Sequence, residues 1–301
     1  MKSSAEIAAT AQVRSQGGWQ SIQTLGMPEL GYAGLSENWM LKTLGHRHWR
    51  LIANAAGQQH ASFKDRSGND VYAAFCALSL DCPGLFLADL DDSLETVSTL
   101  YRVSRARLAS LHVLKLKGEP IASVCLVSTF VSRMVVGENA SVARVDFAGL
   151  PALPALPADL EFPHLAARLA RSGADRHLGL RMSQAEDKDP DLIYETSPSL
   201  DFNRAGLVYF PSFVAAAERA ASNRFGKMAH QYVLRRRDVL FFGNLDLNEP
   251  VAVRIADWVD TGQKVKTSLL LTGVNERRVC EVFCEYGKIN REQPRLSAFG
   301  C

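Results

Sequence analysis

Polar side chains gather at the start of a predicted helix early in the chain. Ser36, Glu37 and Asn38 directly precede a run with apolar residues at helical spacing. The first N–H groups of a helix have no intrahelical acceptor and carry the positive end of the helix dipole. A thioester carbonyl or enolate oxygen placed there would therefore be stabilised. The same three residues also suit an ordinary helix start with Ser36 as N-cap, so that interpretation stays open.

A second polar group precedes the second predicted helix. Asp201 and Asn203 occupy the place there that Glu37 and Asn38 occupy at the first helix. A carboxylate at this position could act as the general base in thioester hydrolysis. Asp and Asn are also common in Asx turns before a helix, which is the alternative.

Two histidines and a tyrosine are further candidates. His46 and His48 lie two positions apart on the first predicted helix and point to different faces, so they do not easily share a metal ion. We expect His48 in the buried stripe, His46 in solvent, and no metal. Tyr72 falls in the first predicted strand, where a tyrosine usually packs. It is a poor nucleophile unless its surroundings favour the phenolate.

In each half of the chain, the sequence pattern predicts one long helix followed by several strands. Apolar spacing predicts helices over 36–52 and 211–221, and runs rich in Val, Leu, Ile and aromatics predict half-buried antiparallel strands. One helix wrapped by a curved antiparallel sheet, given twice, is an α+β fold of the tandem (double) hotdog type. Two unrelated α+β domains are the alternative. The predicted strands are 70–80, 94–103, 110–116, 121–131, 231–234, 239–245, 251–259, 266–272 and 278–286.

A proline-rich stretch divides the two halves. Pro151, Pro154 and Pro157 remove backbone donors and fix φ, so neither a helix nor a ladder can run through them. The stretch predicts an extended connector. The expected divisions are an N-terminal extension (1–26), a first hotdog (27–147), a linker with a short helix near 164–171 and a polar loop (148–190), a second hotdog (191–290) and a C-terminal tail (291–301).

Composition excludes several classes of function. The chain has 301 residues, 47% of them hydrophobic, and a formal net charge of +2. It can therefore bury a sizeable core, and it lacks the basic stripe of a nucleic-acid binder. It shows neither a signal peptide nor an apolar span of membrane length, so we expect a cytoplasmic protein with no nucleic-acid or membrane partner. We expect the basic run 235–237 to be a solvated edge or a phosphate contact for coenzyme A.

The opening motif resembles the LnmK-like bifunctional acyltransferase/decarboxylase family of leinamycin-type polyketide biosynthesis. The strongest likeness is the run from Gly34 to Lys42, followed by Gly45, His48 and Trp49. Weaker likeness extends it over most of the chain between residues 27 and 286. The weaker motifs are Tyr72-Ala73-Ala74-Phe75, Ser128-Thr129-Phe130, Asp201-Phe202-Asn203, Gly206-Leu207 and Tyr209-Phe210.

This resemblance implies a double hotdog enzyme that decarboxylates a (methyl)malonyl-CoA thioester and loads the acyl group onto an acyl carrier protein. It implies that Tyr72 is the acylated residue, with Tyr32 as the fallback. Coenzyme A and phosphopantetheine are substrate carriers, and no cofactor is expected. The implied catalytic residues are Ser36, Glu37, Asn38, His48 and Tyr72. The implied substrate-binding residues are Gly34, Leu35, Trp39, Ser128, Thr129, Asp201 and Asn203.

Other functions compete with this one. An acyl-CoA thioesterase would use the same fold and release free acid without a carrier protein. A dehydratase or hydratase would need a catalytic His/Asp pair, which the sequence does not display convincingly. A non-catalytic scaffold in a synthase assembly would bind a carrier protein without turnover. A monomer and a homodimer are both compatible with a tandem fold.

Overall fold

The computed structural model describes residues 10–14, 18–147, 149–171, 175–182, 189–226 and 231–289. The predicted tail (291–301), most of the predicted polar loop (183–188) and the first nine residues of the predicted N-terminal extension lie outside these described residues. No helix among the described residues is both long and apolar enough to cross a membrane.

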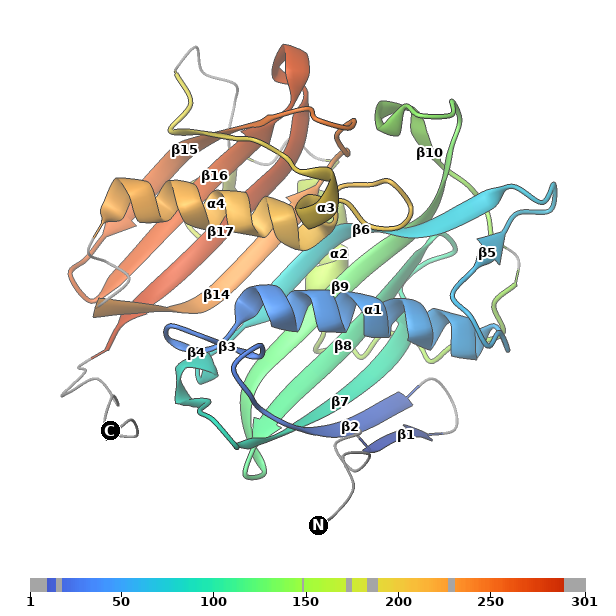
Figure 1. Ribbon diagram of the computed structural model, residues 1–301, viewed down its shortest axis with the longest axis horizontal. Helices are drawn as coiled ribbons and strands as arrows, with labels where there is room; N and C mark the ends of the chain where they lie inside the picture. The colour runs from blue at the N-terminus through green and yellow to red at the C-terminus, as the bar shows by residue number, and fades with distance from the viewer. Residues whose placement is uncertain are drawn as a thin grey trace.

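One curved antiparallel sheet of 13 strands runs through the molecule, with two long helices lying on its concave side (Figure 1). The strand order is β1-β2-β7-β8-β9-β6-β14-β17-β16-β15-β13, with β10 and β5 pairing beside it. This arrangement confirms the predicted double hotdog. The strands are β1 (Thr10–Arg14), β2 (Gly18–Thr24), β5 (Phe63–Lys64), β6 (Asp70–Asp81), β7 (Ser93–Arg102), β8 (Arg107–Leu116), β9 (Glu119–Arg133), β10 (Val142–Arg144), β13 (Leu192–Tyr194), β14 (Tyr232–Phe241), β15 (Val251–Asp260), β16 (Lys264–Thr272) and β17 (Arg278–Lys288).

The remaining elements are short pieces and the helices. The two central helices are α1 (Glu37–Ala55) and α4 (Phe210–Phe225). Two small hairpins lie outside the main sheet: β3 (Leu30–Gly31) with β4 (Gly34–Leu35), and β11 (Arg176–His177) with β12 (Leu180–Arg181). Two further helices are α2 (Phe162–Leu169) and α3 (Pro198–Asp201). The 3-10 turns are η1 (Leu85–Leu87), η2 (Asn139–Ser141) and η3 (Val274–Glu276).

Helix α1 forms where the sequence predicts it. Ser36 is the N-cap, and its Oγ accepts a hydrogen bond from the backbone N–H of Trp39 at 3.3 Å. Met40, Leu44 and His48 recur every four residues and are all buried, so this face lies on the sheet. The N-cap and the inward position of His48 are confirmed.

Helix α4 begins with proline in its first turn and ends at a glycine. Pro211 follows the first helical residue, where its missing N–H costs no hydrogen bond. Ala216, Ala217 and Ala220 are fully buried, so small side chains let the helix approach the sheet closely. Gly226 stops the helix with φ of +53°, a conformation that side-chain-bearing residues rarely adopt.

The two halves meet at the pairing of β6 with β14. Leu78 of β6 lies opposite Val239 of β14, and β9 and β17 flank this pair on either side. The predicted strands 231–234 and 239–245 are one continuous strand, β14. The basic run between them was predicted to be a solvated edge, and this is wrong for Arg237, which is 1% exposed. The reason is that β14 is a central strand of the sheet.

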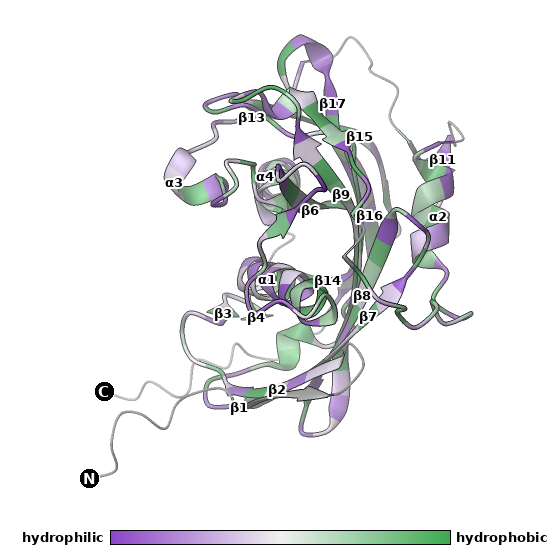
Figure 2. Cartoon of the chain, turned by 90° about the vertical axis from the view of Figure 1, so that its right-hand side faces the viewer, coloured by the Kyte–Doolittle hydropathy of each residue, from purple (hydrophilic) through white to green (hydrophobic). Residues whose placement is uncertain are grey.

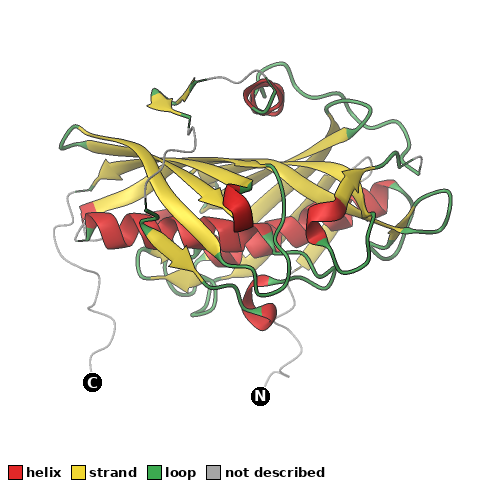
Figure 3. Ribbon diagram, turned by 90° about the horizontal axis from the view of Figure 1, so that it is seen from above, coloured by secondary structure: helices red, strands yellow, loops and turns green. Residues whose placement is uncertain are grey.

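The linker crosses the convex side of the sheet. Helix α2 lies there, opposite the two central helices (Figures 2 and 3). Its apolar residues pack against buried side chains of β6 and β9, such as Ala77 and Val127. The proline-rich segment is tied down where the N–H of Arg102 donates to the carbonyl of Pro154 at 3.0 Å. At the other end of the chain, β2 pairs with β7, so the sheet begins before the predicted boundary at residue 27.

Candidate functional site

A cavity of about 720 Å³ opens between the two halves at the N-terminus of α4. One wall comes from α1 and the first part of β6, and the other from the end of β14, the start of β17 and the segment that leads into α4. Much of the lining is aromatic. The aromatic side chains that line it are Trp49, Tyr72, Phe75, Tyr209, Phe210, Phe213, Phe241 and Phe242. We call it the large cavity.

The first turn of α4 borders the large cavity, and among the described residues the N–H of Phe210 has no hydrogen-bond acceptor within this turn. Pro211 has no N–H, and the N–H of Ser212 donates to the carbonyl of Tyr209 at 2.8 Å. Phe210, the first helical residue, lines the cavity and keeps its N–H without an intrahelical acceptor. Because the positive end of the helix dipole lies at the same place, this amide is suited to a developing negative charge.

His46 places an imidazole at the same cavity. It is exposed, as the helical spacing predicts, and it also lines the cavity wall. Partial burial lowers the pKa of His46, and the positive charges of Arg50 and Arg47 lower it further. The ring is therefore neutral near pH 7 and can accept a proton. Its neighbour Gly45 brings the two helices close, since a Cβ at Gly45 would overlap the Tyr209 hydroxyl and the Phe210 ring.

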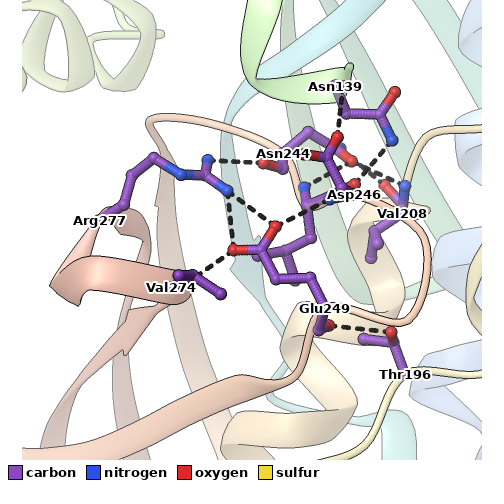
Figure 4. Close-up of polar contacts among 9 residues, drawn as sticks. Asn139, Thr196, Val208, Asn244, Asp246, Glu249, Val274 and Arg277 are labelled. Carbon is purple, nitrogen blue, oxygen red and sulfur yellow. Dashed lines mark hydrogen bonds and ion pairs between the residues drawn. The ribbon is translucent and has the colours of Figure 1, made fainter. Parts of the chain in front are cut away.

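A hydrogen-bonded network holds the loops that frame the large cavity (Figure 4). The Oδ1 of Asn244 accepts from the N–H of Val208 at 2.8 Å, and its Nδ2 donates to the Val208 carbonyl at 3.0 Å. Arg277 donates to the Asn244 carbonyl at 2.7 Å and to the two carboxylate oxygens of Glu249 at 2.9 and 3.0 Å. The segment leading into α4 is therefore fixed before any ligand binds.

A second cavity, of about 250 Å³, lies at the N-terminus of α1. At its base the fully buried guanidinium of Arg237 bridges two carboxylates. Its Nε lies 2.8 Å from the Oε1 of Glu37, and its Nη2 lies 2.7 Å from the Oε2 of Glu218. The hydroxyl of Tyr286 donates to the same Oε2 of Glu218 at 2.9 Å. We call this site the small cavity.

The charges at the small cavity are set by burial and by the arginine. Burial raises the pKa of Glu37, although the Arg237 guanidinium acts in the opposite direction. Burial also raises the pKa of Tyr286 well above its ordinary value, so its phenol stays protonated and donates to Glu218. Glu218 is the most accessible member, with 44% of its side chain exposed. One guanidinium, that of Arg237, thus serves the carboxyl groups of both Glu37 and Glu218.

His48 belongs to neither cavity wall but to a polar layer beneath α1. Its Nδ1 lies 2.7 Å from the Oγ of Ser110, and its Nε2 lies 2.7 Å from the Oγ of Ser128. The Oγ of Ser110 is also hydrogen-bonded to the Nε2 of His112, and the Nδ1 of His112 lies 2.8 Å from the Oγ of Ser98. Burial lowers the pKa of His48 to about 3 and that of His112 well below its ordinary value, so both rings are neutral. The predicted catalytic His48 is therefore a buried link between helix and sheet.

The structure divides the predicted site residues between the two cavities. Tyr72, Thr129 and Asn203 line the large cavity, whereas Leu35 and Glu37 line the small one. Tyr72 lies eight residues before Leu80 in β6, and Leu80 pairs with Arg237, which lines the small cavity. About 26 Å of strand therefore separates Tyr72 from the small cavity. A single site that combines Tyr72 with Ser36 and Asn38 is therefore ruled out by the direction of β6.

Other predicted residues have local structural roles. Ser36 caps α1, and Asn38 and Trp39 lie in its first turn. Gly34 has φ of +101° in the β3–β4 turn. Asp201 is buried and accepts from the N–H of Ser197 and the hydroxyl of Tyr194, both at 2.8 Å.

Asn203 also has a structural role, as the acceptor of an Asx turn. Its Oδ1 accepts from the N–H of Ala205 at 2.9 Å. The Asx-turn alternative for Asn203 therefore holds, and the buried carboxylate of Asp201 is occupied by its partners rather than free to act as a base.

Three residues of the sites were missed by sequence reasoning. His46 was assigned to solvent, yet it borders the large cavity, because α4 approaches α1 beside Gly45. Arg237 was expected at a solvated edge or as a phosphate contact for coenzyme A, and Glu218 was not selected. The available signal was the glutamate within the alanine-rich stretch of α4 and the arginine run in β14, although nothing in the sequence places them against Glu37.

Comparison with known proteins agrees with this fold. No family model matches the chain, and no curated protein matches its sequence. An acyl-ACP thioesterase from Bacteroides thetaiotaomicron superposes with a TM-score of 0.65 at 9% identity, covering 90% of this chain and 98% of its own. The 12:0-ACP thioesterase from Umbellularia californica gives 0.61 at 10% identity, covering 91% and 95%. These likenesses establish the double hotdog fold; the LnmK-like resemblance is not confirmed.

Proposed function

We propose that this protein hydrolyses acyl thioesters at the large cavity. The observation that carries the proposal is that one cavity of about 720 Å³ is lined by both His46, whose imidazole is neutral near pH 7, and Phe210, the first residue of α4. Thioester hydrolysis requires those two groups: a base for water and a donor for the oxyanion. The thioesterases that share the fold support the same class of substrate.

The reaction follows from the positions of these groups. The thioester carbonyl binds with its oxygen at the Phe210 N–H, and His46 takes a proton from a water molecule as the oxygen of that water adds to the carbonyl carbon. The tetrahedral intermediate then expels the thiolate, which receives the proton from the imidazolium. The products are a free acid and a thiol.

The rest of the cavity suits the two ends of such a substrate. The aromatic lining offers an apolar environment for an acyl chain. Arg144 and Arg204, both exposed, border the same cavity. Guanidinium groups bind phosphate strongly, and both coenzyme A and phosphopantetheine carry phosphate at the far end from the thiol.

Decarboxylation with acyl transfer is the second candidate, and a specific observation favours it. Tyr72 and Asn203 border the large cavity, and the carboxylate bordering it among the described residues is Asp70, which pairs with Lys64 at 2.6 Å. Loss of CO2 from a (methyl)malonyl thioester needs an enolate-stabilising donor but no base. Tyr72 would then accept the acyl group before a carrier protein does.

One experiment separates these reactions. The purified protein is incubated with acyl-, malonyl- and methylmalonyl-CoA, with and without an acyl carrier protein, and small products and intact protein are followed by mass spectrometry. Hydrolysis gives free acid of unchanged acyl mass without a carrier. Decarboxylative transfer gives loss of CO2 and an acylated protein that Tyr72→Phe abolishes.

The variant that tests the hydrolase is His46→Gln. We expect it to lower kcat/KM by about 100-fold or more, as loss of a general base does. The matched control is His60→Gln, which removes an exposed histidine outside both cavities. Full hydrolysis by His46→Gln, or no free acid from any thioester with the unaltered protein, contradicts the proposal.

A further inference from the structure

The small cavity occupies in one half of the fold the place that the large cavity occupies in the other. Gly45 and Trp49, the ninth and thirteenth residues of α1, line the large cavity. Glu218 and Ser222, the ninth and thirteenth residues of α4, line the small one. The first residue of the opposite helix completes each site: Phe210 in the large cavity and Glu37 in the small one.

The sheet repeats the same correspondence. Residues 72–76 of β6 line the large cavity, and Tyr232, Val233, Leu234 and Arg237 of β14 line the small one. Because β6 and β14 are the two strands that pair across the centre of the sheet, the two sites are related by the approximate twofold repeat of the chain. The small cavity is thus a second copy of the candidate site, built from different side chains.

The small cavity has a carboxylate, Glu218, at the helix position where the large cavity has Gly45. Glu218 faces it from α4 and is half-exposed, and both of its hydrogen bonds, from Arg237 and Tyr286, go to Oε2. Among the described residues, its Oε1 is therefore left for a water molecule. Two donors on one oxygen fix the orientation of the carboxylate, as a positioned base requires.

The first turn of α1 supplies donors on the opposite side. Ser36 satisfies the N–H of Trp39, and Met40 donates to the Ser36 carbonyl. The N–H groups of Glu37 and Asn38 have no intrahelical acceptor. The first turn of α4, by contrast, leaves only the N–H of Phe210, since Pro211 has none. Arg237 bridges the side chains of Glu37 and Glu218, and both of these residues line the small cavity, so the first residue of α1 and the carboxylate of Glu218 border the same space.

We propose that the small cavity is a second hydrolytic site that takes short acyl thioesters, with Glu218 as its general base. Glu218 takes a proton from water, the water oxygen bonds to the thioester carbonyl carbon, and the carbonyl oxygen is held at the N-terminus of α1 by the N–H of Glu37. The C–S bond then breaks, and the thiolate takes the proton from Glu218. Water is the only co-reactant.

The size of the cavity defines the substrate class. At about 250 Å³ it has about a third of the volume of the large cavity, so it selects short acyl groups. The residues around its mouth include Phe225, Tyr232 and the largely exposed Tyr32, which offer apolar surface to the pantetheine arm of the thioester.

The test compares chain-length profiles. Hydrolysis of acetyl-, butyryl-, octanoyl- and lauroyl-CoA is measured for the full-length protein and for Glu218→Gln, which keeps the size and the donor-facing shape of the side chain. We expect Glu218→Gln to lower kcat for the two short substrates by about 100-fold and to leave the two long ones unchanged. The matched control is Glu285→Gln, a carboxylate on the neighbouring strand that pairs with Lys264 outside both cavities.

A second variant guards against a structural effect of the first. Ser222→Trp places a large ring in the small cavity from an exposed position and leaves Glu218, Arg237 and Glu37 unaltered, and we expect it to raise KM for short substrates alone. Unchanged short-chain hydrolysis by both variants, or its absence from the unaltered protein, overturns this proposal. A loss of long-chain activity with His46→Gln and a loss of short-chain activity with Glu218→Gln are separate results, so either site can fail without the other.

Discussion

The ninth residue of α1 is Gly45 and the ninth residue of α4 is Glu218, and around them the two copies of the same site differ in volume and charge. Where the glycine stands, the cavity is wide and many of its lining side chains are aromatic. Where the glutamate stands, a buried arginine and two carboxyl groups line a smaller cavity. A duplicated fold can therefore keep its backbone while one copy becomes apolar and the other ionic.

The helices themselves differ in the same way. Helix α1 contacts the sheet partly through a buried hydrogen-bonded chain of two histidines and several serines, whereas α4 packs on the sheet through buried alanines. A polar layer stabilises only while every member is hydrogen-bonded and uncharged. The first half should therefore depend on pH in a way that the second does not.

Acidification tests this contrast and should have the largest effect. The pKa values of His48 and His112 are lowered in the folded protein, to about 3 for His48, while unfolded histidine titrates near 6.5. Below pH 6.5 the unfolded chain therefore binds up to two more protons, and the free energy of unfolding should fall by about 2.7 kcal/mol per pH unit. Urea unfolding between pH 7 and 4.5 measures the slope, and a flat profile would contradict the buried neutral pair.

Removing Arg237 should have the next largest effect. Arg237→Met leaves Glu37 and Glu218 without their cation, and breaking a buried ion pair costs about 3–5 kcal/mol. Cys76→Ser is the comparison, because Cys76 borders the large cavity and not the Arg237 cluster. We expect it to lower the free energy of unfolding by less than about 1.5 kcal/mol. Adding Glu37→Met and Glu218→Met to Arg237→Met should restore much of the loss; equal stability of the single and triple variants would show that the charges are not the cause.

Gly45→Ala should have a moderate effect. The added Cβ would overlap the Tyr209 hydroxyl and the Phe210 ring, and overpacking of this kind costs about 1–3 kcal/mol. Tyr209→Phe removes the nearest atom, so the double variant should be more stable than Gly45→Ala alone. Thermal unfolding of the three variants gives the coupling between the positions, and additive effects would mean that the helices do not touch there.

Arg50→Gln should have the smallest effect, on rate rather than stability. Arg50 helps to lower the pKa of His46, so its removal should raise that pKa toward 6.5. If His46 is the base, the acid limb of the plot of kcat/KM against pH moves to higher pH, because the His46 imidazole is then protonated at a higher pH. Lys42→Gln, an exposed change on the same helix, is the control and should leave the limb in place.

Periodicity predicted the elements well because each one satisfies its own backbone. The predicted helix 36–52 begins one residue before α1 and otherwise lies within it, the predicted helix 211–221 lies within α4, and predicted strands such as 70–80 and 251–259 match β6 and β15 to within a residue. The prediction of two separate strands within β14 was wrong. Consecutive arginines indicate an exposed segment unless the neighbours of the strand are known. Strand order, set by long-range pairing, is what buried Arg237.

The sequence by itself determined that two helices, the first capped by Ser36, each precede a set of antiparallel strands, and that polar residues gather before both helices. Those features depend on spacing and on contacts a few residues apart. Only the tertiary structure decided which polar groups share a site, because residues 200 positions apart, Glu37 and Arg237, meet through the pairing of β6 with β14 and the crossing of α1 with α4. It separated Tyr72 from Ser36, paired the buried His48 with Ser110 and Ser128, and gave Gly45 and Glu218 their opposite roles.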